Sequence, residues 1–73
     1  MKKEKLQNIL REKNVPDYYY NLDNIGEIDQ RVCLEFNGEN WMVYYSERGK
    51  KFDLIKYQTE DEACSDILNR LVK

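Results

Sequence analysis

Histidine is absent from the chain, and proline, cysteine and glycine are scarce, with one, two and three residues among 73. Without histidine, the chain lacks the commonest general base and the commonest metal ligand of proteins. Two cysteines are too few for the disulfide framework of a small secreted domain, which indicates free thiols. No apolar run approaches the roughly 20 residues that span a bilayer, and no apolar stretch follows the basic N-terminal residues as in a signal peptide. We therefore expect a cytoplasmic protein without membrane contact.

The length and the net charge of the chain further limit the classes of protein to which it can belong. A chain of 73 residues is short for one domain, so residues 1–73 are expected to form a single domain with a small core. Apolar residues make up 41% and charged residues 36%, which is typical of a folded chain and not of a disordered one. The net charge of −2 argues against free nucleic-acid binding, because such binding requires a basic surface.

Two segments have the period of amphipathic helices. In residues 3–13, Leu6, Ile9 and Leu10 recur on one stripe, and Pro16 prevents the helix from continuing. Residues 59–62 (TEDE) form a capping box that predicts the start of a second helix. The apolar residues that then recur at helical spacing are Ala63, Cys64, Ile67, Leu68 and Leu71.

Three segments between the helices alternate apolar and other residues, as strands do: residues 32–36, 41–45 and 52–57. Residues 37–40 (NGEN) and 47–50 (ERGK) have turn composition. In the first hairpin we expect Phe36 opposite Trp41. In the second we expect Tyr45 opposite Phe52 and, two residues further from the turn, Val43 opposite Leu54. The predicted fold is α+β with the order α-β-β-β-α: a three-stranded antiparallel meander sheet with two helices packed on one face.

The segment 14–29 has no clear period and exceeds the usual length of a structureless loop. Residues 18–22 are compatible with a helical turn or an edge strand. The apolar side chains of the segment can close the open end of a small core; they are Val15, Leu22, Ile25 and Ile28.

The sheet face opposite the helices is expected to be partly apolar, whereas a solvent-facing side is normally polar. Such a face indicates a partner surface, a cover formed by residues 14–29, or a homodimer contact. Cys33 would be accessible on this face, with Cys64 buried on the other. The side chains expected on it are Cys33, Glu35, Met42, Tyr44, Asp53, Ile55 and Tyr57.

Charge is unevenly distributed along the chain. Residues 14–47 contain seven acidic residues and one basic residue, and they include three consecutive tyrosines at 18–20. An acidic surface complements a basic partner, and tyrosine is favoured at interfaces. The candidate partner-binding residues, drawn from this segment and the opposite sheet face, are Asp17, Tyr19, Tyr20, Asp23, Glu27, Asp29, Glu35, Met42, Tyr44 and Ile55.

Catalytic and metal-binding patterns are not found. Ser46 and Ser65 have no histidine as a base, and the acids between residues 17 and 29 lack the ligand spacing of a calcium loop. We expect a protein that is not an enzyme and needs neither metal nor cofactor.

The predicted element order is that of the double-stranded RNA-binding domain. That family grips phosphates with lysines at the start of its second helix, where this chain has residues 59–62 (TEDE), so we do not expect RNA binding. Stacking of bases on Tyr44 and Tyr57 is a weaker alternative.

A second resemblance involves sequence. Residues 41–54 (WMVYYSERGKKFDL) and 59–64 (TEDEAC), with 15–19 (VPDYY) and 32–35 (VCLE) upstream, resemble small bacterial immunity proteins. Such proteins neutralise polymorphic or contact-dependent toxins by direct binding. The resemblance implies a cytosolic inhibitor that blocks a cognate toxin domain, as a monomer or a weak homodimer. A nuclease is the toxin class considered, because an acidic surface can occupy a phosphate-binding site. The alternative is a structural or regulatory subunit of a larger complex.

Overall fold

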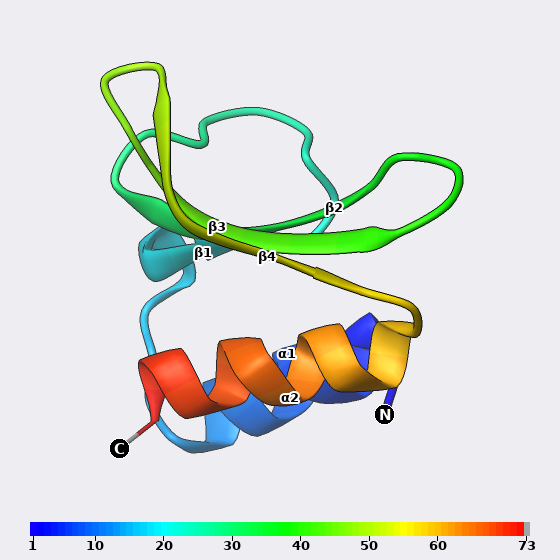
Figure 1. The fold of residues 1–73 in the computed structure, drawn as a ribbon. Helices are drawn as coiled ribbons and strands as arrows, with labels where there is room; N and C mark the ends of the chain where they lie inside the picture. Colours follow the sequence, from blue (N-terminus) through cyan, green and yellow to red (C-terminus); the bar gives the residue numbers. More distant parts are fainter. Residues whose placement is uncertain (73) are drawn as a thin grey trace.

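The computed structural model describes residues 1–72, which form two helices, a short 3-10 helix and one four-stranded sheet (Figure 1). The sheet order is β1-β2-β3-β4, with β1 parallel to β2 and the remaining neighbours antiparallel. The elements in chain order are α1 (Lys3–Glu12), η1 (Asp17–Tyr19), β1 (Tyr20–Asn21), β2 (Arg31–Phe36), β3 (Trp41–Glu47), β4 (Lys50–Tyr57) and α2 (Glu60–Leu71).

Both helices lie on one side of the sheet, as expected, and the connection between β1 and β2 lies on the other (Figure 1). The α+β class is therefore confirmed. The core between helices and sheet contains Leu6 and Leu10 from α1, Ile67 from α2, and Leu34 and Val43 from the sheet. No helix among the described residues has the length and apolar character needed to cross a membrane.

The predicted three-stranded antiparallel sheet is wrong in strand number and direction. After η1, the two residues of β1 add a parallel strand at the edge, with Tyr20 opposite Val32 and Asn21 opposite Cys33. A strand of two residues is too short to show an alternation of apolar and polar residues. The segment 18–22 thus contains both of the elements considered for it, a helical turn and an edge strand.

The parallel pairing of β1 explains why the opposite sheet face is covered. Parallel neighbours need a connection that returns along the strand. Residues 22–30 make this return across the sheet face opposite the helices, where Ile28 packs against buried Cys33, Met42 and Tyr44. Of the three explanations considered for this face, the structure supports the cover; the expected exposure of Cys33, Met42 and Tyr44 is wrong.

A β-bulge changes the expected register of β4. Tyr45 lies opposite Phe52 as predicted, but Val43 lies opposite Ile55 instead of Leu54, and Asp53 has a positive φ of 54°. Aspartate is among the few residues besides glycine that adopt this left-handed conformation readily. The bulge places Ile55 on the helix side of the sheet, so its expected position on the opposite face is wrong.

Side chains from α2 hold the bulge in place. The guanidinium of Arg70 donates to the carbonyl of Asp53 at 2.7 Å and pairs with Asp66 at 2.8 Å. Asp66 also accepts a hydrogen bond of 2.7 Å from the Tyr57 hydroxyl. Tyr57 therefore faces α2, and its expected position on the opposite face is also wrong.

Candidate functional site

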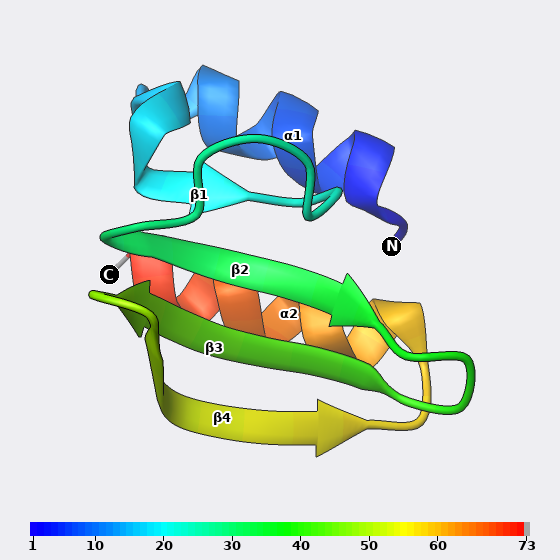
Figure 2. The same ribbon diagram turned by 90° about the horizontal axis from the view of Figure 1, so that it is seen from above.

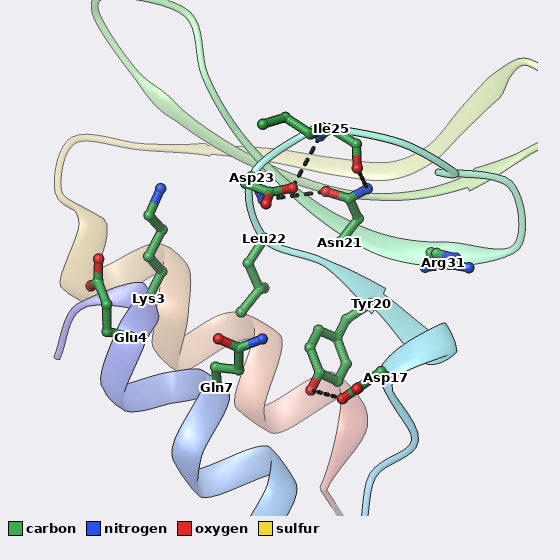
Figure 3. Close-up of a pocket in the computed structure, with 10 residues that line it drawn as sticks. All are labelled: Lys3, Glu4, Gln7, Asp17, Tyr20, Asn21, Leu22, Asp23, Ile25 and Arg31. Atoms are coloured by element: carbon green, nitrogen blue, oxygen red, sulfur yellow. Dashed lines mark hydrogen bonds between the residues drawn. The ribbon is translucent and has the colours of Figure 1, made fainter.

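The loop between β1 and β2, residues 22–30, is organised by one buried side chain; we call it the acidic loop. Asn21 is 6% exposed, and its amide group makes four hydrogen bonds with loop backbone. Figure 3 draws those with Asp23 and Ile25. Nδ2 donates to the carbonyls of Ile25 at 2.9 Å and Glu27 at 3.0 Å. Oδ1 accepts from the amides of Asp23 at 3.2 Å and Asn24 at 2.6 Å. Both ends of the Asn21 amide thus hold the loop in one conformation.

Three carboxylates also stabilise the acidic loop while their residues remain exposed. Asp23 accepts from the amide of Ile25 at 3.0 Å, and Glu27 accepts from the amide of Asp29 at 2.9 Å. Asp29 accepts from the amide of Arg48 at 2.7 Å, which ties the loop to the turn between β3 and β4. Since an ionised carboxylate accepts several hydrogen bonds, each of these acids can also bind a partner.

Large apolar side chains are exposed beside these acids. Ile25 is 75% exposed between Asp23 and Glu27, so the expectation that it closes the core is wrong. Tyr18 and Tyr19, in η1, are 64% and 49% exposed, with ring centroids 5.2 Å apart in an edge-to-face arrangement.

Sequence reasoning missed Ile25 and Tyr18 as candidate site residues. The available signal for Ile25 was its position between Asn24 and Gly26, because such turn residues often flank the tip of a loop. No comparable signal distinguished Tyr18 from its two tyrosine neighbours.

The structure separates the ten predicted site residues into distinct places. Tyr20 packs into the core, and its hydroxyl donates to Asp17 at 2.9 Å. Burial and the hydrogen bond to Asp17 raise the pKa of Tyr20. Ile55 lies on β4, at the opposite edge of the sheet from β1. The predicted residues that remain exposed in η1 and the acidic loop are Asp17, Tyr19, Asp23, Glu27 and Asp29.

Glu35, Met42 and Tyr44 lie beneath or beside the acidic loop. The hydroxyl of Tyr44 donates to the Glu35 carboxylate at 2.8 Å, and the Lys51 ammonium lies 3.9 Å from that carboxylate and 4.8 Å from the Tyr44 ring centroid. Burial, and then the hydrogen bond to Glu35, raise the pKa of Tyr44, which keeps the hydroxyl protonated as a donor. Tyr44, Glu35 and Lys51 thus contact one another, and this arrangement stabilises the sheet face.

A cavity of about 390 Å³ separates the acidic loop from α1 (Figure 3). Its charged lining residues are of both signs: Lys3 and Arg31, with Glu4, Asp17 and Asp23. Ile25 lies on the same cavity, so the apolar side chain and the acids border one concavity. A side chain of a protein partner can enter this concavity, whose lining offers both acidic and basic groups as well as Ile25.

Both thiols are fully buried, in separate clusters on the two sides of the sheet. Cys33 and Cys64 are free, which confirms the expectation of unbridged thiols on opposite sides. Burial raises the pKa of each thiol to about 11.

We expect neither thiol to react with a maleimide at pH 7–8 in the folded protein. With a pKa of about 11, on the order of one thiol in a thousand is ionised at pH 8, and only the thiolate is an effective nucleophile. Labelling should become fast only in urea, or as the pH approaches the raised pKa. Mass spectrometry over time, in buffer and in urea, measures this; prompt native labelling of Cys33 would contradict its burial.

Within the described part of the chain, no three metal-ligating side chains come together as a group that could hold a metal ion. Searches with protein-family models, against curated proteins and against solved structures found no match for this chain.

Proposed function

We propose that this chain is a small inhibitor of the immunity type, which binds a cognate toxin domain through the acidic loop and the exposed tyrosines of η1. The observation that carries the proposal is Ile25, 75% exposed between acidic residues on a loop that Asn21 holds in one conformation. Binding energy usually concentrates in a few apolar anchors surrounded by polar groups. A loop already fixed before binding also loses less entropy in the complex.

Charge favours a basic partner. Residues 14–47 carry seven acidic and one basic residue, and the acids of the loop remain exposed beside Ile25. Such a surface speeds association with a basic protein and can occupy a site that attracts phosphate. A nuclease is therefore the proposed toxin class, and the resemblance of residues 41–54 and 59–64 to immunity proteins supports the same role. In this proposal the chain acts by contact alone, without catalysis or a cofactor.

The alternatives have less support from the geometry. A subunit that joins a larger complex through the sheet face opposite the helices would need that face free, but Met42 and Tyr44 are buried there. Base stacking would use the rings of Tyr44 and Tyr57, yet one is buried and the other is hydrogen-bonded to Asp66.

The test is binding and neutralisation of the protein encoded beside this chain's gene in its native host. We expect Ile25→Ala combined with Tyr19→Ala to weaken the complex about tenfold or more in calorimetry, without changing the circular dichroism of the free protein. Asp23→Asn and Glu27→Gln should mainly slow association and reduce its salt dependence. The matched control is Ile55→Ala, which truncates an isoleucine 45% exposed at the far edge of the sheet.

The control also shows which results would contradict the proposal. If Ile55→Ala weakens the complex while the Ile25→Ala, Tyr19→Ala double variant binds normally, the acidic loop is not the binding site. A further outcome is that the neighbouring protein binds this chain and yet is harmless to cells, with an activity that the chain does not reduce. That result would make the chain a subunit and not an inhibitor.

A further inference from the structure

The opposite edge of the sheet carries a second surface, of opposite charge. Within residues 1–72, β4 pairs only with β3, and Figure 2 shows it at the margin of the sheet with no helix or strand of this range along its other side. Every residue from Lys50 to Lys56 is exposed. Such an edge presents unpaired backbone groups to other strands.

Two backbone positions on β4 face away from the sheet. The carbonyl of Ser46 accepts from the amide of Gln30 at 2.6 Å. The backbone carbonyl of Ser46, in β3, therefore points towards the β2 side of the sheet and away from β4. Bonding directions alternate along a strand, so Met42 also faces β2. Lys51 lies opposite Ser46, and Lys56 lies opposite Met42. The amide and carbonyl groups of these two lysines therefore point outward, where an added strand would bind them.

The bulge at Asp53 determines which side chains of β4 share a face of the sheet. Lys51 and Lys56 are an odd number of residues apart and would point to opposite faces of a regular strand. With the extra residue, both lie on the face of Ser46 and Met42, away from the helices. Phe52 and Ile55, 43% and 45% exposed, share the helix face. Lys51 and Lys56 thus lie on one side of the edge, and the apolar Phe52 and Ile55 lie on the other, where Lys50 stands at the end beside the turn.

The apolar side opens into a groove between β4 and α2. A cavity of about 540 Å³ there is lined on the sheet side by Val32, Tyr45 and Ile55. Its polar lining residues are Asp53, Asp66, Asn69 and Arg70, and Arg70 is ion-paired with Asp66. Alternate side chains of a strand added to β4 would point into this groove, and the intervening ones would point towards the lysines.

A second copy of the chain fits this edge poorly. If two β4 strands pair antiparallel about their middle, Lys51 of each faces Lys56 of the other, and directly opposed like charges are destabilising. Residues 48–57 contain four basic residues and one acidic residue, a net charge of +3. We propose that the β4 edge binds an extended acidic segment of a partner protein, in which acidic and apolar residues alternate, as a fifth strand of the sheet.

The two lysines contribute unequally to this recognition. Lys51 already lies 3.9 Å from Glu35 and over the Tyr44 ring, so an acidic strand must compete with Glu35 for it. Lys56 takes part in no ion pair among the described residues. Lys56 is therefore the charge that selects an acidic strand.

The test uses a capped peptide of about eight alternating valine and glutamate residues, the length of an ordinary strand, and its valine–lysine counterpart. We expect the acidic peptide to shift the amide NMR signals of β4 and to slow hydrogen exchange at Lys51 and Lys56, while the basic peptide does neither. Lys56→Glu should weaken binding about fivefold or more, whereas Lys5→Glu should not. Lys5 is exposed on α1, so its substitution makes the same charge change away from β4.

Several outcomes would overturn the proposal. These are equal binding of both peptides, absence of binding up to about 1 mM acidic peptide, and shifts confined to the acidic loop. Shifts of β4 signals that depend on protein concentration without peptide would instead assign this edge to a second copy. The Lys56→Glu variant is at an exposed position, and its own spectrum shows whether the fold is kept. Ile25 and the exposed tyrosines of η1 lie beside β1, at the other edge of the sheet, so failure of peptide binding at β4 would leave the proposed toxin site untouched.

Discussion

Replacing Tyr44 with alanine should lower the free energy of unfolding by about 3–5 kcal/mol. Tyr44 is 1% exposed and lies between Cys33, Met42 and the covering Ile28, on the sheet face opposite the helices. Truncation leaves a cavity that its neighbours cannot fill, and it removes the donor to Glu35. Urea denaturation followed by the fluorescence of Trp41 measures the loss.

Tyr44→Phe is the control that separates packing from hydrogen bonding. It keeps the ring and loses only the 2.8 Å bond to Glu35, whose carboxylate retains Lys51 as a neighbour. We expect a loss of about 1–2 kcal/mol. A loss below about 1 kcal/mol for Tyr44→Ala would show that the acidic loop does not cover this face in solution.

Asn21→Ala is expected to cost about 2–4 kcal/mol, because it removes four hydrogen bonds worth roughly 0.5–1.5 kcal/mol each. The loss of stability should appear first as faster hydrogen exchange at the amides of Asp23 and Asn24. In the native loop these amides donate hydrogen bonds to Oδ1 of Asn21. Toxin binding should weaken as well, since the loop would no longer be fixed before it meets the partner.

Two further substitutions make this prediction specific. Asn21→Asp keeps an oxygen for the amides of Asp23 and Asn24, but its second oxygen faces the carbonyls of Ile25 and Glu27, which also only accept, so it should destabilise the protein at least as much as Asn21→Ala. Asn8→Ala changes an exposed residue of α1 and should have an effect within about 0.5 kcal/mol. Equal stability of Asn21→Ala and Asn8→Ala would mean that Asn21 does not hold the loop.

The elements with regular periods were predictable from local sequence. The predicted N-cap at residue 59 is present, with the Thr59 hydroxyl accepting from the Glu62 amide at 3.2 Å at the start of α2. The Glu62 carboxylate accepts from the same hydroxyl at 3.0 Å, whereas in a full capping box it would accept from the Thr59 amide. The pairing of Phe36 with Trp41 and of Tyr45 with Phe52 is as predicted. Helix period, strand alternation and turn composition depend on neighbours a few residues apart, and these remain readable in a single sequence. The concentration of acids and tyrosines at the candidate site was also visible there.

Three features depended on contacts between distant parts of the chain. β1 exists through its pairing with β2, and the return of the chain from that parallel pairing brings Ile28 onto Tyr44. The bulge at Asp53 is held by Arg70 of α2. Asn21 organises the acidic loop from a position that its sequence neighbours do not reveal.

Local patterns are equally compatible with an uncovered sheet face and a regular β4. Without the bulge, Ile55 would share a face with Met42 and Tyr44; with it, Ile55 faces the groove beside α2. The sequence therefore determined which side chains are apolar, acidic or basic and which segments are helices and strands. The tertiary structure decided which of those side chains reach the surface. A single inserted residue reverses the face on which the following side chains of β4 lie, and the return of the chain from one parallel strand covers a sheet face that would otherwise be open.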